Sequence, residues 1–217
     1  MQGTVRGGLL ALLSVVWLSG HSVAAAGAPT DFIRYTTDSI LQVFEAPHLQ
    51  GATHREERVA RLRRIANAAF DWEEIARRAL ATHWRERTPQ ERREFTELFR
   101  EAVQEMYLRR LEEAAQQQLQ ERPAILYGEE EVKDQRAVVR TTVVTRRYRE
   151  VPMEYRLRQV DGQWRIYDIV IAGVSLVNNF RAQFHRIITQ SSYDELIQRL
   201  KARQLGEVLA EPPRPSH

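Results

Sequence analysis

The sequence predicts an α+β protein, in which a helical first half is followed by an antiparallel sheet and then by further helices. Three observations support this fold class. Apolar residues recur every three or four positions up to about residue 119, the spacing typical of amphipathic helices. From about residue 124 to residue 171 they alternate with polar residues, as in strands. The segment Gln163–Ile188 then joins a strand to an amphipathic helix through Gly173.

Four helices are expected before the sheet, and capping residues mark the start of two of them. The expected helices cover about residues 31–45, 54–70, 72–84 and 89–119. Asp71 is placed to accept a hydrogen bond from the backbone N–H of Glu74. Thr88 and Glu91 have the spacing of a capping box, in which each side chain bonds the backbone N–H of the other.

About four strands with short connections follow, which indicates an antiparallel meander. They cover about residues 124–132, 135–147, 151–159 and 164–171. Asp161 and Gly162 form a favoured hairpin turn between the last two strands. Ser175 and Ser192 are expected to cap two helices that follow the sheet.

The two ends of the chain are expected to lie outside the folded domain. Residues 1–26 combine one cation, a short apolar run and several alanines, which is typical of a cleaved secretory signal peptide. The apolar run is shorter than the roughly twenty residues that a membrane-spanning helix needs. Residues 27–205 are expected to form a single domain, and residues 206–217 a disordered tail. The chain has no Cys, which excludes disulfides and a lipidated cysteine.

The charges of the chain argue against a nucleic-acid partner. The 32 Lys and Arg residues are nearly balanced by 29 Asp and Glu residues, and the two signs are interleaved along the expected helices. A nucleic-acid-binding protein would concentrate its positive charge. Arg156 and Arg158 share the polar face of one strand, with Arg146 nearby. This group is either a solvated sheet face or a patch for anionic lipid headgroups or an acidic partner.

No enzymatic activity is expected. Ser175 stands between a strand and a helix, as the nucleophile of an α/β-hydrolase does. However, Val177 replaces the second glycine of that motif, and Asp168 precedes the serine instead of following it. We therefore interpret Ser175 as a helix cap. The sequence has no metal-ligand spacing and no glycine-rich phosphate loop, so no metal or cofactor is expected.

The inner face of the expected sheet and the apolar stripes of the expected helices form the candidate binding surface. The strand residues are Val139, Val143, Met153, Tyr155 and Leu157, and the helix residues are Phe44, Phe70, Ile75, Leu98, Phe99, Phe180 and Phe184. Periodicity does not distinguish a solid core made of these side chains from a cleft lined by them.

Three segments of the chain resemble the MlaC family, the periplasmic phospholipid-binding carriers also called toluene-tolerance auxiliary proteins. They are FDWEEIARRAL, HWRERTPQERREFTELFREAV and WRIYDIVIAGVSLVNNFRAQF. The resemblance extends over about residues 31–202. It departs from the family pattern at Ala81, where Gly is frequent, at Ala172, where Glu is frequent, and at Gln190–Ser192, where members often have a Lys-Gly turn.

The resemblance implies a deep apolar cavity between sheet and helices that holds phospholipid acyl chains, so the twelve candidate residues are expected to bind lipid. It also implies a periplasmic carrier that maintains outer-membrane lipid asymmetry. Its partners would be an inner-membrane ABC transporter complex with a substrate-binding ring and an outer-membrane lipoprotein complex. Two alternatives stay open: a non-enzymatic periplasmic adaptor or binding module with a solid core, and a carrier of another apolar ligand.

Overall fold

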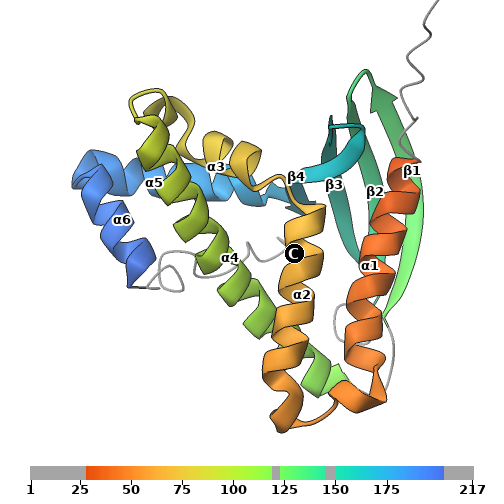
Figure 1. The fold of residues 1–217 in the computed structure, drawn as a ribbon. Coiled ribbons are helices and arrows are strands. Elements are labelled where there is room, and N and C mark those ends of the chain that lie inside the picture. Colours follow the sequence, from red (N-terminus) through yellow and green to blue (C-terminus); the bar gives the residue numbers. More distant parts are fainter. Residues whose placement is uncertain (1–27, 119–122, 145–149, 203–217) are drawn as a thin grey trace, which may run out of the picture.

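The computed structural model describes residues 28–118, 123–144 and 150–202, and these residues form the α+β fold that the sequence predicts (Figure 1). The long strands lie on one side of the molecule, and α5 and α6 lie on the other. The predicted signal peptide and the predicted C-terminal tail both lie outside the described residues, as does Arg146. None of the helices in the described ranges combines the length and the apolar character needed to cross a membrane.

The helices and strands agree with the expected ranges to within a few residues, apart from the second strand, which is described only to Val144. The chain forms α1 (Pro29–Glu45), η1 (Pro47–Leu49), η2 (Ala52–His54), α2 (Arg55–Ala69), α3 (Trp72–Leu80), η3 (Ala81–Trp84), α4 (Pro89–Gln118), β1 (Ala124–Lys133), β2 (Arg136–Val144), β3 (Val151–Val160), β4 (Gln163–Ile171), β5 (Val174–Ser175), α5 (Leu176–Gln190) and α6 (Tyr193–Lys201). The sequence predicted about four strands, and the two-residue β5 is a fifth.

The predicted helix caps are present. Asp71 Oδ1 accepts from the backbone N–H of Glu74 at 3.1 Å. Thr88 and Glu91 form both bonds of the capping box, at 2.7 and 3.2 Å. Before α6, Ser192 Oγ accepts from the backbone N–H of Glu195 at 3.0 Å. These bonds satisfy N–H groups that the helix itself leaves without partners.

The sheet is an antiparallel meander in the order β1-β2-β3-β4-β5. Its register places Val139 opposite Tyr155. We call the face that bears Val139 the inner face and the opposite face the outer face. The β3–β4 hairpin turns at Asp161 and Gly162, which have φ angles of 50° and 74°, as the predicted turn type requires.

Helices cover both faces of the sheet. Ile33 of α1 and Ala69 of α2 pack with Val139 against the inner face, in a group we call the sheet cluster. On the outer face, Tyr167 of β4 packs with α3, α4, α5 and α6 in the helical cluster, which is centred on Phe99. A third group, the end cluster, joins α1, η1, α2 and α4 through Val43, Leu49, Leu62 and Leu108.

Candidate functional site

The structure distributes the twelve predicted lipid-binding residues over three clusters and one end of the sheet. Ile75, Phe99, Phe180 and Phe184 are buried in the helical cluster, with Leu98 at its margin. The centroid of the Phe99 ring lies 5.0 Å from that of Phe180 and 5.1 Å from that of Phe184, in edge-to-face geometry. Such contacts are typical of a packed aromatic core.

The sheet cluster contains a second set of the predicted residues. Val139 and Leu157 are fully buried there, and Tyr155 packs at its edge. The Tyr155 hydroxyl donates to the sulfur of Met153 across 3.7 Å, and burial raises the pKa of this hydroxyl. Phe70 packs against both the sheet cluster and the helical cluster, whereas Phe44 belongs to the margin of the end cluster.

Val143 and Met153 lie in a different environment, at one end of the inner face. The register places Ile125, Val143 and Val151 side by side across β1, β2 and β3, and Met153 opposite Ile171 of β4. These five apolar side chains are only partly buried, and none belongs to the three clusters. We call them the half-exposed end. Ile125, Val151 and Ile171 are not among the twelve predicted residues, although the strand alternation contains all three.

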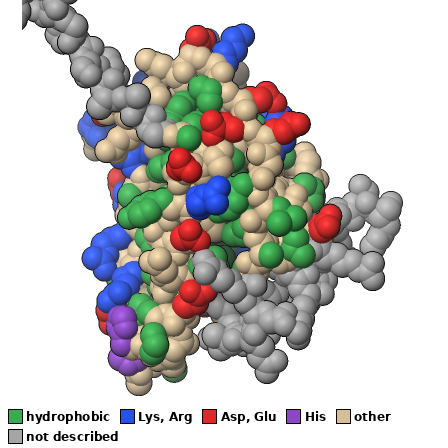
Figure 2. Space-filling model, turned by 90° about the vertical axis from the view of Figure 1, so that its right-hand side faces the viewer, with side chains coloured by type: hydrophobic (Ala, Val, Ile, Leu, Met, Phe, Trp, Pro, Cys, Tyr) green, Lys and Arg blue, Asp and Glu red, His purple; other side chains and the backbone are tan. Residues whose placement is uncertain are grey.

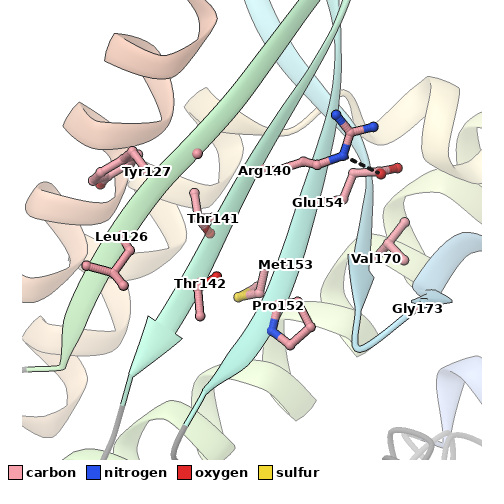
Figure 3. A pocket seen from close by; sticks show the side chains of 11 residues that line it. Leu126, Tyr127, Arg140, Thr141, Thr142, Pro152, Met153, Glu154, Val170 and Gly173 are labelled. Carbon is pink, nitrogen blue, oxygen red and sulfur yellow. Dashed lines mark ion pairs between the residues drawn. The ribbon is translucent and has the colours of Figure 1, made fainter.

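A shallow hollow of about 370 Å³ opens on the outer face of the same part of the sheet (Figure 3). Leu126, with 57% of its surface exposed, and Val170 give it apolar walls. Its rim is charged, because Arg140 forms ion pairs with Glu131 at 2.5 Å and with Glu154 at 3.6 Å. A rim of this kind is less suited to acyl chains than the half-exposed end on the inner face.

The surface on the β1 side of the molecule is mixed in character. Figure 2 shows hydrophobic side chains that are separated by acidic and basic ones on this face. Scattered apolar side chains are normal on a protein surface and do not by themselves indicate a binding site. We therefore place the candidate site at the inner face of the sheet.

The join between β4 and α5 is held by a buried polar network. Ser175 Oγ donates to Asp168 Oδ2 at 2.7 Å and accepts from the backbone N–H of Asn178 at 3.1 Å. The other carboxylate oxygen of Asp168 accepts from the backbone N–H of Val177 at 3.1 Å. Ser175 is therefore the N-cap of α5, as predicted.

The geometry around Ser175 does not resemble a catalytic triad. His185 stacks on His83, with a distance of 3.1 Å between ring nitrogens, and among the described residues no hydrogen bond links it to Ser175. The part of the chain that the structure describes also contains no cluster of three or more acidic or histidine residues placed to hold a metal ion.

The predicted pair of strand arginines is largely neutralised by carboxylates. Arg156 bonds Glu154 at 2.8 Å and Asp168 at 3.2 Å. Arg158 forms an ion pair with Asp71, whose backbone N–H donates to the carbonyl of Ile166. These bonds connect the sheet to the start of α3. The two side chains therefore form a solvated, ion-paired face rather than a free patch of positive charge.

The fold and the candidate site define an α+β protein with an apolar sheet face beneath amphipathic helices. The family model described as MlaC protein matches residues 34–202, which is most of the chain. The chain therefore belongs to the MlaC family.

Two relatives agree with this assignment. The chain is 25% identical over 195 residues to the toluene tolerance protein Ttg2D of Pseudomonas putida, covering 89% of this chain and 87% of that protein. Its fold is similar to that of a phospholipid-binding protein from Ralstonia solanacearum, which was solved in complex with a phospholipid at 1.53 Å resolution. That structure has a TM-score of 0.66 and 19% identity, and it covers 84% of this chain and 99% of its own.

Proposed function

We propose that this protein is a non-enzymatic, phospholipid-binding carrier of the periplasm. The observation that supports this most directly is its membership of the MlaC family over residues 34–202. The fold relative from Ralstonia solanacearum, which holds a phospholipid, supports the same ligand class. The expected signal peptide supports a periplasmic location.

The half-exposed end gives the acyl chains a place to bind. Five branched or flexible apolar side chains from four adjacent strands share one face there. Each methylene group moved from water to such a surface contributes about 0.8 kcal/mol, so ten of them contribute about 8 kcal/mol. We infer that the headgroup stays near solvent while the chains lie between this end and the helices.

A carrier that binds acyl chains this tightly needs partners that favour release. A ligand shifts a conformational equilibrium only through its different affinities for the two states. We propose that an inner-membrane ABC transporter complex and an outer-membrane lipoprotein complex each bind the protein in a state that opens the inner face. Exchange of phospholipid between them would maintain outer-membrane lipid asymmetry.

The first experiment is native mass spectrometry and lipid extraction on the protein purified from a bacterial periplasm. The carrier is expected to retain phospholipid and to take it up from vesicles after it has been stripped. A clean ligand-free mass together with no uptake would favour the alternative of an adaptor with a solid core.

A pair of neighbouring substitutions tests the position of the site. Ile125→Glu places a charge on the inner face at the half-exposed end, whereas Leu126→Glu places the same charge on the outer face one residue later. We expect Ile125→Glu to lower lipid loading several-fold and Leu126→Glu to leave it unchanged, with both proteins folded by circular dichroism. The reverse result would place the lipid in the outer hollow.

A further inference from the structure

A second hollow, of about 460 Å³, lies between α3, η3, the sheet and the start of α5. We call it the arginine hollow, because Arg77, Arg78, Arg85, Arg156 and Arg181 all line it. They come from α3, from the residue after η3, from β3 and from α5, so the fold brings Arg156 and Arg181 together with three arginines from residues 77–85. Asp168 is the single carboxylate among the lining residues.

Asp168 carries one negative charge and is paired with Arg156, so it does not offset the charges of the other four arginines. One of its oxygens accepts from Ser175 and Arg156, and the other accepts from the backbone N–H of Val177. The side chain is buried. The first N–H groups of α5 are likewise taken by Asp168 and Ser175, so attraction for an anion rests on the arginine side chains.

Two of the five arginines are held in place by a carboxylate behind them. Glu74 accepts from Arg77 at 2.7 and 2.8 Å and from Arg78 at 2.6 Å. The guanidinium carbon of Arg78 also lies 4.2 Å from the centroid of the Tyr167 ring. A single carboxylate therefore faces two cations, and both guanidinium groups are oriented before any ligand arrives.

The remaining pair, Arg85 and Arg181, has no carboxylate partner among the described residues. Both side chains are exposed to solvent. Guanidinium groups are weakly hydrated and planar, and they bind oxyanions through two parallel N–H donors. Their position at the arginine hollow leaves it with positive charge that no carboxylate in the described part of the chain pairs with.

We propose that the arginine hollow binds a phosphate group, with Arg85 and Arg181 as its principal ligands. A phosphate presents three or four acceptor oxygens and can meet several guanidinium groups at once, whereas a carboxylate presents two. The phosphate belongs either to a phospholipid headgroup or to a free phosphate. The first source rests on the proposed function, since it requires a bound lipid.

The test uses the full-length protein, stripped of lipid, and inorganic phosphate as the probe. Two-dimensional NMR follows the arginine side-chain N–H signals and the backbone amide of Asn178 during titration at constant ionic strength. We expect saturable shifts with phosphate and none with chloride. A double variant, Arg85→Gln with Arg181→Gln, is expected to weaken binding by at least about tenfold.

The matched control removes two arginines elsewhere on the surface. Arg93 and Arg186 are exposed and do not line the hollow, so replacing both by Gln changes the net charge equally. This control is expected to bind phosphate as the unmodified protein does. Equal weakening in both double variants, or the absence of saturation, would overturn the proposal.

A second titration separates the two sources of phosphate and the two proposals. Protein loaded with phosphatidylglycerol should no longer bind inorganic phosphate if the hollow holds the headgroup, and should bind it unchanged if the ligand is free phosphate. Either result supports the phosphate site. Saturable phosphate binding in a protein that never takes up lipid would overturn only the proposed function. Lipid uptake without saturable phosphate binding would overturn only this inference.

Discussion

Ser175 donates a hydrogen bond to Asp168 across 2.7 Å, and only 7% and 5% of the surfaces of these residues are exposed. This pair fixes the beginning of α5 to strand β4. Asp168 strengthens the join by accepting from the backbone N–H of Val177. The angle between the sheet and the helix that covers it therefore depends on one buried carboxylate and one hydroxyl.

Replacing Ser175 by Ala should destabilise the protein without changing its ligand. The change removes the N-cap of α5 and one partner of Asp168, so we expect the free energy of unfolding to fall by about 1–2 kcal/mol. Ser192→Ala, which removes an exposed cap alone, should cost less. Denaturant titration measures both losses. Lipid loading that disappears in a folded Ser175→Ala protein would contradict the purely structural role of this residue.

Replacing Ala81 by Gly should stabilise the protein. Ala81 follows α3 with φ of 50° and ψ of −115°, a conformation that strongly favours glycine. We expect a gain of about 1 kcal/mol, after allowing for the greater freedom of glycine in the unfolded chain. The matched control is Ala60→Gly, an exposed position inside α2, which should lose about 0.5–1 kcal/mol. The same Ala→Gly substitution is thus expected to stabilise the protein at one site and destabilise it at the other. Thermal unfolding measures both effects.

Replacing Phe99 by Ala should be among the most damaging changes in the helical cluster. Phe99 is 1% exposed and its ring contacts Phe95, Phe180 and Phe184. Removing such a ring typically costs about 3–5 kcal/mol, and denaturant unfolding of the lipid-free protein gives the loss. If the lipid-free variant lost less than about 1 kcal/mol, Phe99 would line an open lipid cavity instead of a packed core.

Glu74 makes the stability of the protein dependent on acid pH. Burial alone would raise the pKa of Glu74, but hydrogen bonds from Arg77 and Arg78 outweigh it and lower the pKa from 4.5 to about 2. Because the folded-state pKa is the lower one, this contribution is complete above about pH 4.5 and is lost as the pH falls towards about pH 2.

The free energy of unfolding of Glu74→Gln should therefore fall less between about pH 4.5 and pH 2 than that of the unmodified protein. Unfolding titrations across this pH window provide the measurement. Glu57→Gln is the control, since that exposed carboxylate has one arginine partner at the surface and should alter the pH profile less. If the free energy of unfolding fell equally at acid pH in Glu74→Gln and in the unmodified protein, Glu74 would be excluded as the cause of the pH dependence.

Val143→Trp should lower lipid loading without unfolding the protein. Val143 lies at the half-exposed end and is only partly buried, and the Trp ring would occupy the space that we assign to acyl chains. We expect several-fold less phospholipid by extraction and a loss of stability of about 1–3 kcal/mol, which leaves the protein folded. Unchanged loading would remove Val143 from the candidate residues.

The caps and turns could be predicted because they depend on neighbours in the sequence. The Thr88–Glu91 box, the Asp71 cap and the Asp161–Gly162 turn each involve residues at most three positions apart. The strand ranges followed in the same way from alternation along a single segment. These features need no knowledge of how distant parts of the chain meet.

The environment of each apolar residue could not be predicted, because it depends on register and on irregular pairing. An extra residue in β4, opposite Arg156 and Leu157, interrupts the alternation near Tyr167, which packs against the helices on the outer face. Alternation alone also could not show that Phe99 and Val139 belong to different clusters. The lipid-binding role of the twelve residues stays a prediction.

The position of Phe70 between two clusters affects how protection from hydrogen exchange would spread when a ligand binds. Phe70 packs against both the helical and the sheet clusters, and its backbone pairs with Ile166. A ligand that settles against the sheet should therefore slow hydrogen exchange first in β2 and β3. Protection should reach the core around Phe184 later, through this ring and through β4, which contributes Tyr167 to the helical cluster. Phe70→Ala should weaken the coupling of hydrogen exchange between the two regions.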